Sequence, residues 1–328
     1  MRTRRLFLLP IVAALAGLSC DESFSPKEPL VDRAFLYCIV NYSRLETRTQ
    51  FAIVNRSYDV NGTNPVVNGV DPFIDGAEMK LSVRTTEYLF RSGSMSGADT
   101  TRYGTPVKYY AARNVLVYPL DVVTVVASLP DGSRLSGHTT VPAVKPLESH
   151  PTYVSGFTTQ VNRFTQGERY VLDWEDGSHD GHLFFPSLTL TYEREDSADK
   201  SFAIAVPTGI SVQNGHRVAV YPHPSTATHC EFTFEAIDEA MRSIAEGDTL
   251  KSRYRPVSLN FTVVECDFAL TRYYMSVNGA LDQYSLRLDE STYTNVQGGS
   301  GVVGSTTTFG INNTIDPRYA RLFGYQGY

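Results

Sequence analysis

Between residues 31 and 145 the sequence repeats one pattern: short, partly apolar runs separated by clusters of turn-forming residues. The runs include AFLYCIVNY, QFAIVNRSY, EMKLSVRTTEYLF and DVVTVVASL, and the stretches between them are rich in Gly, Asn, Asp and Pro. Short runs in which apolar and polar residues alternate predict β-strands, and such clusters predict the turns between them. The number and spacing of the runs favour an immunoglobulin-like β-sandwich of about 100 residues.

One hairpin in this region can be predicted from its turn. The segments VVTVVASL and SRLSGHTTV flank Pro130, Asp131 and Gly132. An Asp-Gly pair suits the positive φ of a tight hairpin turn. We therefore predict that these two segments form neighbouring antiparallel strands.

A second β-rich domain is predicted after the stretch Val144–Leu147, which contains Pro146. Further strand-like runs follow, among them ERYVLDW, SLTLTYERE, CEFTFEA and VSLNFTVVEC. Trp174 in the first of these runs resembles the core tryptophan of a fibronectin-type sandwich, so we expect it to be buried. The predicted fold is mostly β, with tandem immunoglobulin- and fibronectin-like sandwiches over residues 31–146 and 147–328.

Two segments of the second half have the period of a helix instead. Apolar residues recur on one helical face at Ile237, Ala240, Met241, Ile244 and Ala245, and again at Leu270, Tyr273, Tyr274 and Val277. Gly247 is expected to stop the first helix, and Asp267 to cap the start of the second. We expect both short helices to cover an edge or open face of the second sandwich, and the glycine-rich tail to form a closing strand.

The first 19 residues predict a secretory signal peptide. Basic residues precede the apolar run LFLLPIVAALAGLS, which is shorter than the roughly 20 residues of a membrane-spanning helix. Small residues followed by Cys20 resemble the lipobox of bacterial lipoproteins, in which the thiol receives a diacylglycerol. Gly17 departs from that motif, which prefers leucine there, so an ordinary signal peptide with a chance cysteine is the alternative. Residues 20–30 are polar and predict a tether between the lipid and the folded chain.

The charge of the chain limits its partners. The formal net charge is −6, and it becomes −9 once Arg2, Arg4 and Arg5 leave with the signal peptide. An acidic chain without a long basic run argues against nucleic acid as a partner. It also has no polybasic patch for lipid headgroups, so the predicted acyl group on Cys20 would be its attachment to the membrane.

Three cysteines remain besides Cys20. Cys38 lies in the apolar run AFLYCIV and is expected to be a buried thiol. Cys230 and Cys266 fall on strand-like segments, and an oxidising compartment would permit a disulfide between them. Their spacing cannot show whether their Cα atoms approach closely enough, so free thiols are the alternative.

The densest polar cluster, WEDGSHDGH, offers the best candidate for a metal site. His179, Asp180 and His182 are of the types that coordinate metals. No helix or strand spacing fixes their geometry, however, and a polar loop between strands needs the same residues. We favour the loop and expect no cofactor. The sequence contains no G-x-S-x-G motif, so an enzyme is not expected.

The order of features along the chain resembles a known family. The lipobox and the first sandwich are followed by the DGSRLSGHTTVP hairpin, the TRYYMSV helix and the stretch STYTNVQGGSGVVGS. This order is similar to that of the Bacteroidota outer-membrane lipoproteins called domain of unknown function 4249 (DUF4249). The most specific part runs from Thr294 through Asn295 to Gly304, and the resemblance covers nearly all of the mature chain. Asp21 and Glu22 also resemble the export signals of Bacteroidota surface lipoproteins, whereas in enterobacteria an aspartate after the cysteine would suggest retention in the inner membrane.

This resemblance implies a cellular location and a partner rather than a catalysed reaction. The family has no established activity, and its members often accompany TonB-dependent transporters of the outer membrane. We therefore expect a lipid-anchored binding or accessory component of the outer membrane, facing the cell surface or the periplasm. One alternative is a structural envelope or adhesion lipoprotein, although such proteins usually repeat one module. A metal-dependent hydrolase is the least favoured hypothesis.

Overall fold

The computed structural model describes most of the chain beyond its first 31 residues. The described residues are 32–42, 47–57, 71–95, 106–155, 157–161, 169–174, 181–195, 197, 201–278 and 293–325. The chain divides into two units, Met1–Asp32 and Arg33–Tyr328, and every strand and helix named here belongs to the second. The predicted signal peptide, the tether, Cys20, His179 and Asp180 lie outside the described residues.

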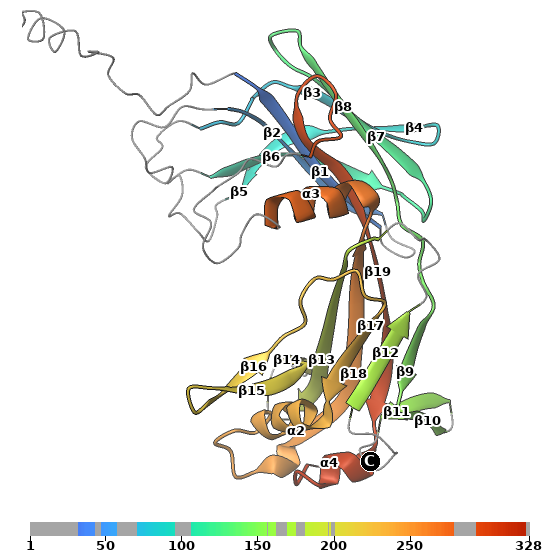
Figure 1. Cartoon of the computed structure of the whole chain (residues 1–328), viewed down its shortest axis with the longest axis vertical. Helices are drawn as coiled ribbons and strands as arrows, with labels where there is room; N and C mark the ends of the chain where they lie inside the picture. The colour runs from blue at the N-terminus through green and yellow to red at the C-terminus, as the bar shows by residue number, and fades with distance from the viewer. Residues whose placement is uncertain are drawn as a thin grey trace, which may run out of the picture. The chain divides into compact units, whose positions relative to one another are not determined.

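The second unit is mostly β and contains two β-sandwiches in tandem, as predicted (Figure 1). In the first sandwich, one sheet has the order β4-β3-β7-β8 and packs against the β1, β2, β6 and β5 part of a larger sheet. The bounds are β1 Ala34–Tyr42, β2 Arg48–Arg56, β3 Glu78–Val83, β4 Thr86–Leu89, β5 Arg91–Met95, β6 Val107–Val115, β7 Val122–Ser128 and β8 Arg134–Thr140. Along β3 and β7 every second residue is buried, which is the period of two that the sequence shows.

The hairpin of β7 and β8 is confirmed. Seven residue pairs join these strands, from Val122 with Thr140 to Ser128 with Arg134. Gly132 has a φ of +86°. The neighbouring Asp131 accepts a hydrogen bond from the Ser133 backbone N–H at 2.8 Å. The turn therefore uses the two residues that were expected to form it.

The second sandwich packs the β14-β13-β18-β19 part of the larger sheet against a three-stranded sheet with the order β17-β12-β9. The bounds are β9 Leu147–His150, β12 Arg169–Trp174, β13 Phe184–Arg194, β14 Ser201–Val206, β17 His229–Thr233, β18 Tyr254–Cys266 and β19 Ser300–Ile315. Trp174 is 3% exposed, and its ring lies 5.5 Å from that of Phe184 and 6.0 Å from that of Phe261. Its predicted place in the core is confirmed.

Shorter elements complete the second half. Two hairpins are formed by β10 with β11 and by β15 with β16, and the 3₁₀ helix η3 precedes β18. The bounds are β10 Thr152–Ser155, β11 Thr158–Val161, β15 Gly209–Gln213, β16 His216–Val220 and η3 Lys251–Arg253. The end of β19 pairs with β11, so that hairpin joins the larger sheet.

Two of the helices close the second core. Helix α2 (Phe234–Ser243) buries Ile237 and Met241 and is capped by the Thr233 side chain, so the predicted helix is confirmed. Helix α4 (Pro317–Arg321) was not predicted, although Asp316 before Pro317 is a recognisable start signal. In Figure 1 both helices lie at the same end of the second sandwich. No described helix is long and apolar enough to cross a membrane.

Helix α3 (Phe268–Asn278) forms where it was predicted and packs against residues of both sandwiches. Asp267 caps it, because its Oδ1 accepts a hydrogen bond from the Leu270 N–H at 2.8 Å. Leu270 packs in a small cluster that includes Val302 of β19 and Tyr37 of β1, a strand of the first sandwich. Phe185 of β13 and Cys266 of β18 belong to the same cluster, so α3 covers part of the second sandwich, as expected, and also contacts the first, which was not predicted.

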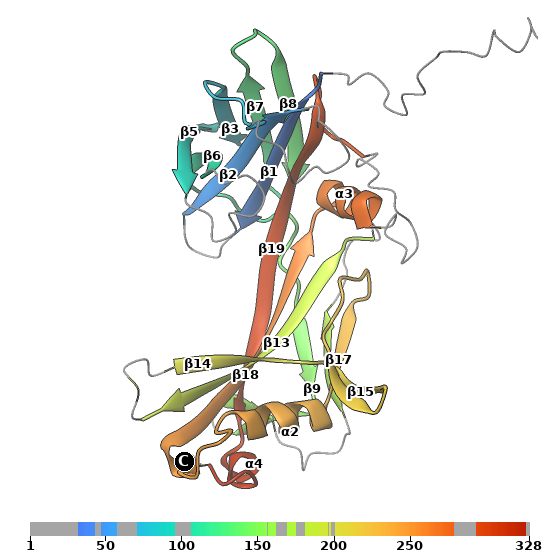
Figure 2. The ribbon, with the colours of Figure 1, turned by 90° about the vertical axis from the view of Figure 1, so that its left-hand side faces the viewer.

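The tail forms the strand that joins the two sandwiches (Figure 2). Strand β19 pairs in parallel with β1 over Ser300–Thr307, and antiparallel with β18 over Thr306–Thr314. The first core consequently contains Val303 and the preceding Val296. The predicted ranges 31–146 and 147–328 place β19 in the second domain only, although it also pairs with β1 of the first. Sequence periodicity does not show which strands are paired.

The remaining cysteines are free thiols. Cys38 is buried in the first core, as predicted, and burial raises the pKa of its thiol to about 12. The Cys230–Cys266 disulfide is not present. Cys230 lies in the second core opposite Leu172, whereas Cys266 ends β18 opposite Thr306 and belongs to the small cluster under α3.

Candidate functional site

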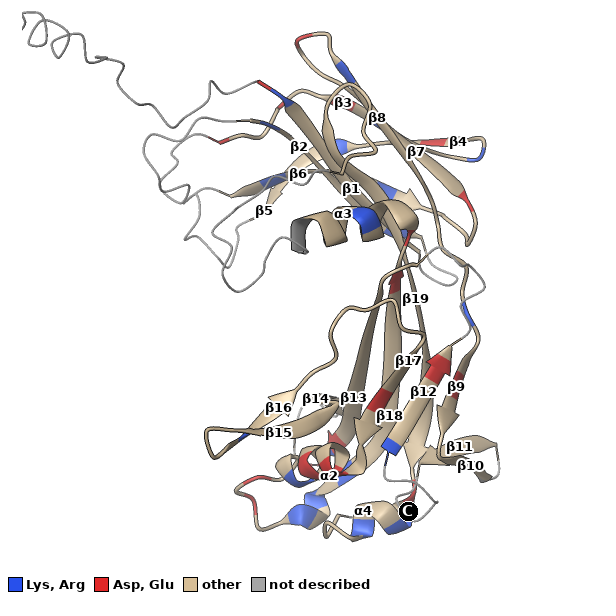
Figure 3. Ribbon diagram, viewed as in Figure 1, with Lys and Arg blue, Asp and Glu red and all other residues tan. Residues whose placement is uncertain are grey.

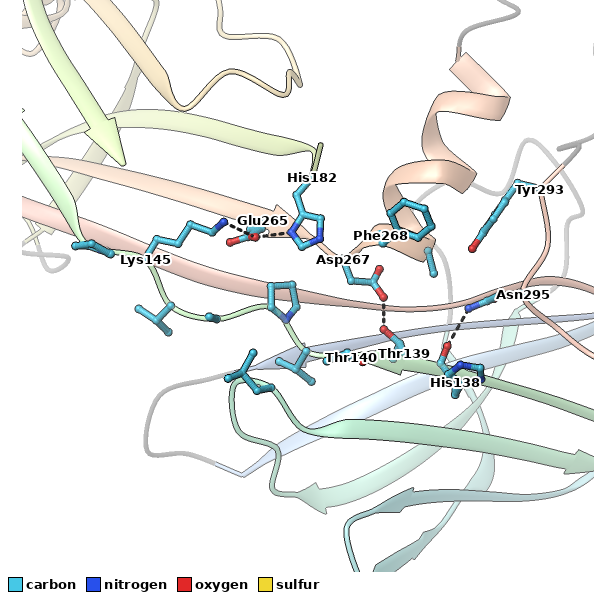
Figure 4. A pocket seen from close by; sticks show the side chains of 17 residues that line it. His138, Thr139, Thr140, Lys145, His182, Glu265, Asp267, Phe268, Tyr293 and Asn295 are labelled. Carbon is cyan, nitrogen blue, oxygen red and sulfur yellow. Dashed lines mark hydrogen bonds and ion pairs between the residues drawn. The ribbon is translucent and has the colours of Figure 1, made fainter. Parts of the chain in front are cut away.

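A cavity of about 730 Å³ lies where residues from both sandwiches meet (Figure 4). One wall is the stretch His138–Pro146, which leaves β8 and leads toward the second sandwich. The other walls come from His182, from the end of β18 with the start of α3, and from Tyr293 and Asn295. Residues 144–146, interpreted from sequence as a domain boundary, therefore line a cavity.

A buried group of charged side chains lies at one end of this cavity. The Lys145 Nζ lies 3.0 Å from Glu265 Oε1, and the His182 Nδ1 lies 2.7 Å from the same oxygen. Lys145 is 8% exposed and Glu265 is 1% exposed. Burying a charge is costly unless it is paired, so the Lys145–Glu265 contact is what makes this arrangement tolerable. The second oxygen, Glu265 Oε2, is buried and has no hydrogen-bond partner in the described part of the chain.

Asp267 connects two strands, β8 and β19, with α3 beside that group. Its side chain caps α3 and also bonds to the Thr139 hydroxyl of β8, while its backbone N–H donates to the Ser305 carbonyl of β19 at 2.9 Å. The Thr139 and Ser305 hydroxyl oxygens lie 2.9 Å apart. Burial raises the pKa of the Asp267 carboxyl above its ordinary value. This carboxyl is therefore protonated more readily than an exposed one.

Asn295 fixes the far wall of the cavity. Its side-chain Nδ2 donates to the carbonyls of His138 at 3.0 Å and Val303 at 2.7 Å, and its Oδ1 accepts from the Val303 N–H at 2.9 Å. The following glycines let this segment pass close to its neighbours. At Gly301, where φ is +115°, a Cβ would lie 2.2 Å from the Leu36 carbonyl oxygen. The asparagine and glycines that carry the family resemblance thus have a structural role in this chain.

The candidate metal site, for which a polar loop is the favoured alternative, is not assembled in the described residues. His182 contacts Glu265, while His179 and Asp180 lie outside the described part of the chain. Among the residues that the structure describes, no group of three or more His, Cys, Asp or Glu side chains could hold a metal ion.

Sequence reasoning missed the Lys145–Glu265–His182 group. One signal was available: Glu265 stands within the run NFTVVECDF, which reads as a buried strand. An acidic residue in such a run needs a partner, because carboxylates are almost never fully buried without one. The identity of that partner could not be read, since Lys145 lies 120 residues away along the chain.

The cavity suits binding better than nucleophilic catalysis. The thiol of Cys266 follows Glu265, but burial and the neighbouring acids raise its pKa to about 12, so it stays protonated. The Thr139 hydroxyl is engaged with the Asp267 carboxyl, and the Ser305 hydroxyl with Thr139 and the Thr140 carbonyl. An apolar cavity with a few convergent polar groups is the usual form of a small-ligand site.

The sequence comparisons with protein families and curated proteins assign no function to this cavity. No protein-family model matches the chain, and no curated protein matches it. The resemblance to DUF4249 stays a prediction made from the order of features in the sequence. Since a fold by itself does not specify a function, the chemistry of the cavity bears most directly on it.

Proposed function

We propose that the mature chain is a lipid-anchored binding protein of the bacterial cell envelope, which holds a small ligand in the cavity between its sandwiches. It acts as an accessory component of a TonB-dependent transporter in the outer membrane, on the surface or periplasmic side. Cys20 carries the lipid, and the folded unit presents the ligand.

The observation that carries this proposal is the cavity. Its volume of about 730 Å³ falls within the range of small-molecule sites, about 300–1,000 Å³. Its walls are held by specific contacts between distant segments, such as Lys145 with Glu265 and Asn295 with His138. A site held in this way is formed before the ligand arrives, which lowers the entropic cost of binding.

The cellular setting rests on the sequence. The signal-like start, the cysteine at position 20 and the polar stretch after it support the anchor. The resemblance to DUF4249 supports the transporter as partner. Basic and acidic residues are interspersed along the described strands and helices (Figure 3).

Co-purification tests the setting. A C-terminal tag on the wild type and on a Cys20→Ala variant allows the outer-membrane proteins that accompany each form to be compared by mass spectrometry. We expect a TonB-dependent transporter to be enriched with the wild type and lost with the variant. If no outer-membrane transporter accompanies a lipidated wild type, the accessory role is wrong and a structural role becomes the better explanation.

A further inference from the structure

We propose that the cavity selects ligands in which a protonated amine is attached to an apolar chain, with the ammonium group held at the Glu265 and Asp267 end. This inference rests on the proposed function, because it names the class of ligand that the cavity takes. It is argued from the balance of charge, from the hydrogen-bonding groups and from the walls.

The balance of charge inside the cavity favours a cation. Glu265 and Asp267 both line it and are 1% and 4% exposed. Lys145, which also lines it, forms its ion pair with Glu265. No lysine or arginine of the described residues forms an ion pair with Asp267. Beside the two buried acids lie one lysine and the His182 ring, which is charged only when protonated. With a neutral His182, a ligand ammonium would supply the second positive charge.

The hydrogen-bonding groups of Glu265 also favour a ligand with an ammonium group. Lys145 and His182 both contact Glu265 Oε1, which leaves the buried Oε2 without a donor in the described part of the chain. A buried acceptor without a donor is costly, especially on a carboxylate. An ammonium group carries three donors and no acceptor, whereas a carboxylate ligand would add acceptors where they are already in excess.

The rest of the cavity is suited to an apolar chain. Val141, Pro142, Ala143 and Val144 form one wall, and the rings of Phe268 and Tyr293 stand on another (Figure 4). The Arg272 guanidinium already lies 4.9 Å from the centre of the Phe268 ring. The ammonium is therefore assigned to the carboxyl groups rather than to that ring.

Three probes of equal length and different charge test this inference: hexylamine, 1-hexanol and hexanoate. Binding to the purified folded chain is measured by isothermal titration calorimetry near neutral pH. We expect hexylamine to bind at least about tenfold more tightly than 1-hexanol, since hydrogen bonds to charged groups are the stronger ones. Hexanoate should bind most weakly.

Variants of the cavity residues test which side chains cause the preference for hexylamine over 1-hexanol. Asp267→Asn keeps a residue that can cap α3 but removes the charge, and should reduce the preference for hexylamine over 1-hexanol. A Lys145→Met/Glu265→Gln double variant removes both partners of the buried ion pair, so that no charge is left unpaired, and should reduce it further. Glu148→Gln, which alters an exposed carboxylate outside the cavity, is the matched control and should leave the preference unchanged.

The outcomes separate this inference from the proposed function. If 1-hexanol or hexanoate binds as tightly as hexylamine, the amine class is wrong, while the cavity remains a ligand site. The same conclusion follows if both cavity variants keep the full preference. If none of the three probes binds, the amine inference is overturned and the cavity loses its support as a ligand site.

Discussion

The two sandwiches share one architecture but fill their cores with different side chains. The first core is mainly aliphatic, with Val, Leu, Ala and Ile from both of its sheets. The second contains many more rings, and its buried aromatic residues are Tyr170, Trp174, Phe184, Phe232, Phe234, Tyr254, Phe261, Phe309, Tyr319 and Tyr325. The difference follows from what faces the larger sheet in each sandwich.

In the first sandwich a four-stranded sheet covers that face, so two layers of similar width meet and small alternating side chains fill the space. In the second sandwich the facing sheet has three strands, and α2 and α4 complete the cover. Helices and strands leave irregular space between them, and large rings fill it. A few rings thus carry much of the second core, whereas many small residues share the first.

The largest expected effect is the loss of one ring from the second core. Phe261 is 1% exposed and lies 6.0 Å from the ring of Trp174 and 6.1 Å from that of Phe232. We expect Phe261→Ala to lower the free energy of unfolding by about 3–5 kcal/mol, measured by urea denaturation. Phe157→Ala is the control, because Phe157 is fully exposed and its loss should change stability by less than about 0.5 kcal/mol. Equal effects would show that the rings do not carry the second core.

The strand shared by the two cores should be nearly as sensitive. An alanine Cβ at Gly301 would meet the Leu36 carbonyl and adopt a φ of +115°, so Gly301→Ala should cost about 2–4 kcal/mol. Gly132→Ala is its matched control, because Gly132 also has a positive φ but open space around it. That change should cost only about 1 kcal/mol, again from urea denaturation. If both variants cost the same, close contact with β1 is not what selects glycine at 301.

A truncation in the first core should have a smaller effect than the loss of the Phe261 ring. Val125 is fully buried in the middle of β7. Val125→Ala removes two methyl groups, and we expect it to lower the free energy of unfolding by about 1.5–2.5 kcal/mol. A loss as large as that of Phe261→Ala would mean that the first core also depends on single residues.

The smallest effect concerns pH. Burial raises the pKa of Asp267 above 3.8, so the folded state holds this proton more tightly than the unfolded state does. Stability from this group is therefore greatest in acid and falls as the pH rises above 3.8 toward the folded-state pKa. Asn at this position does not titrate, so the free energy of unfolding of the wild type should decline relative to Asp267→Asn over that window, measured by urea denaturation at several pH values.

Asp131 is the control for that experiment, because it should behave in the opposite way. Hydrogen bonds from Ser133 lower the pKa of Asp131 below 3.8. Its contribution to stability is present above 3.8 and is lost as the pH falls below that value. The wild type should therefore lose stability in acid relative to Asp131→Asn. The same pH trend for both pairs would contradict the assignment of burial as the cause at Asp267.

Local features were predictable from the sequence, and long-range ones were not. The turn at Gly132, the cap at Asp267 and the buried face of α2 each depend on residues within a few positions of one another. The parallel pairing of β1 with β19 depends on sheet order, which periodicity does not encode. In the Lys145–Glu265–His182 group, Glu265 was recognisable as a buried acid that needs a partner, but its partners are distant in sequence and were not predictable.

The parallel pairing of β1 with β19 also affects how the chain folds. Phe35 pairs with Ser300 and Tyr42 with Thr307, so the interval between partners is about 265 residues. Contacts this remote form late, because a long loop must close before they are made. Almost the whole chain must be present before the first sandwich can close, and until then the edge of β1 would be open to pairing with other chains. We therefore expect newly made chains to depend on a chaperone that prevents aggregation until β19 has paired with β1.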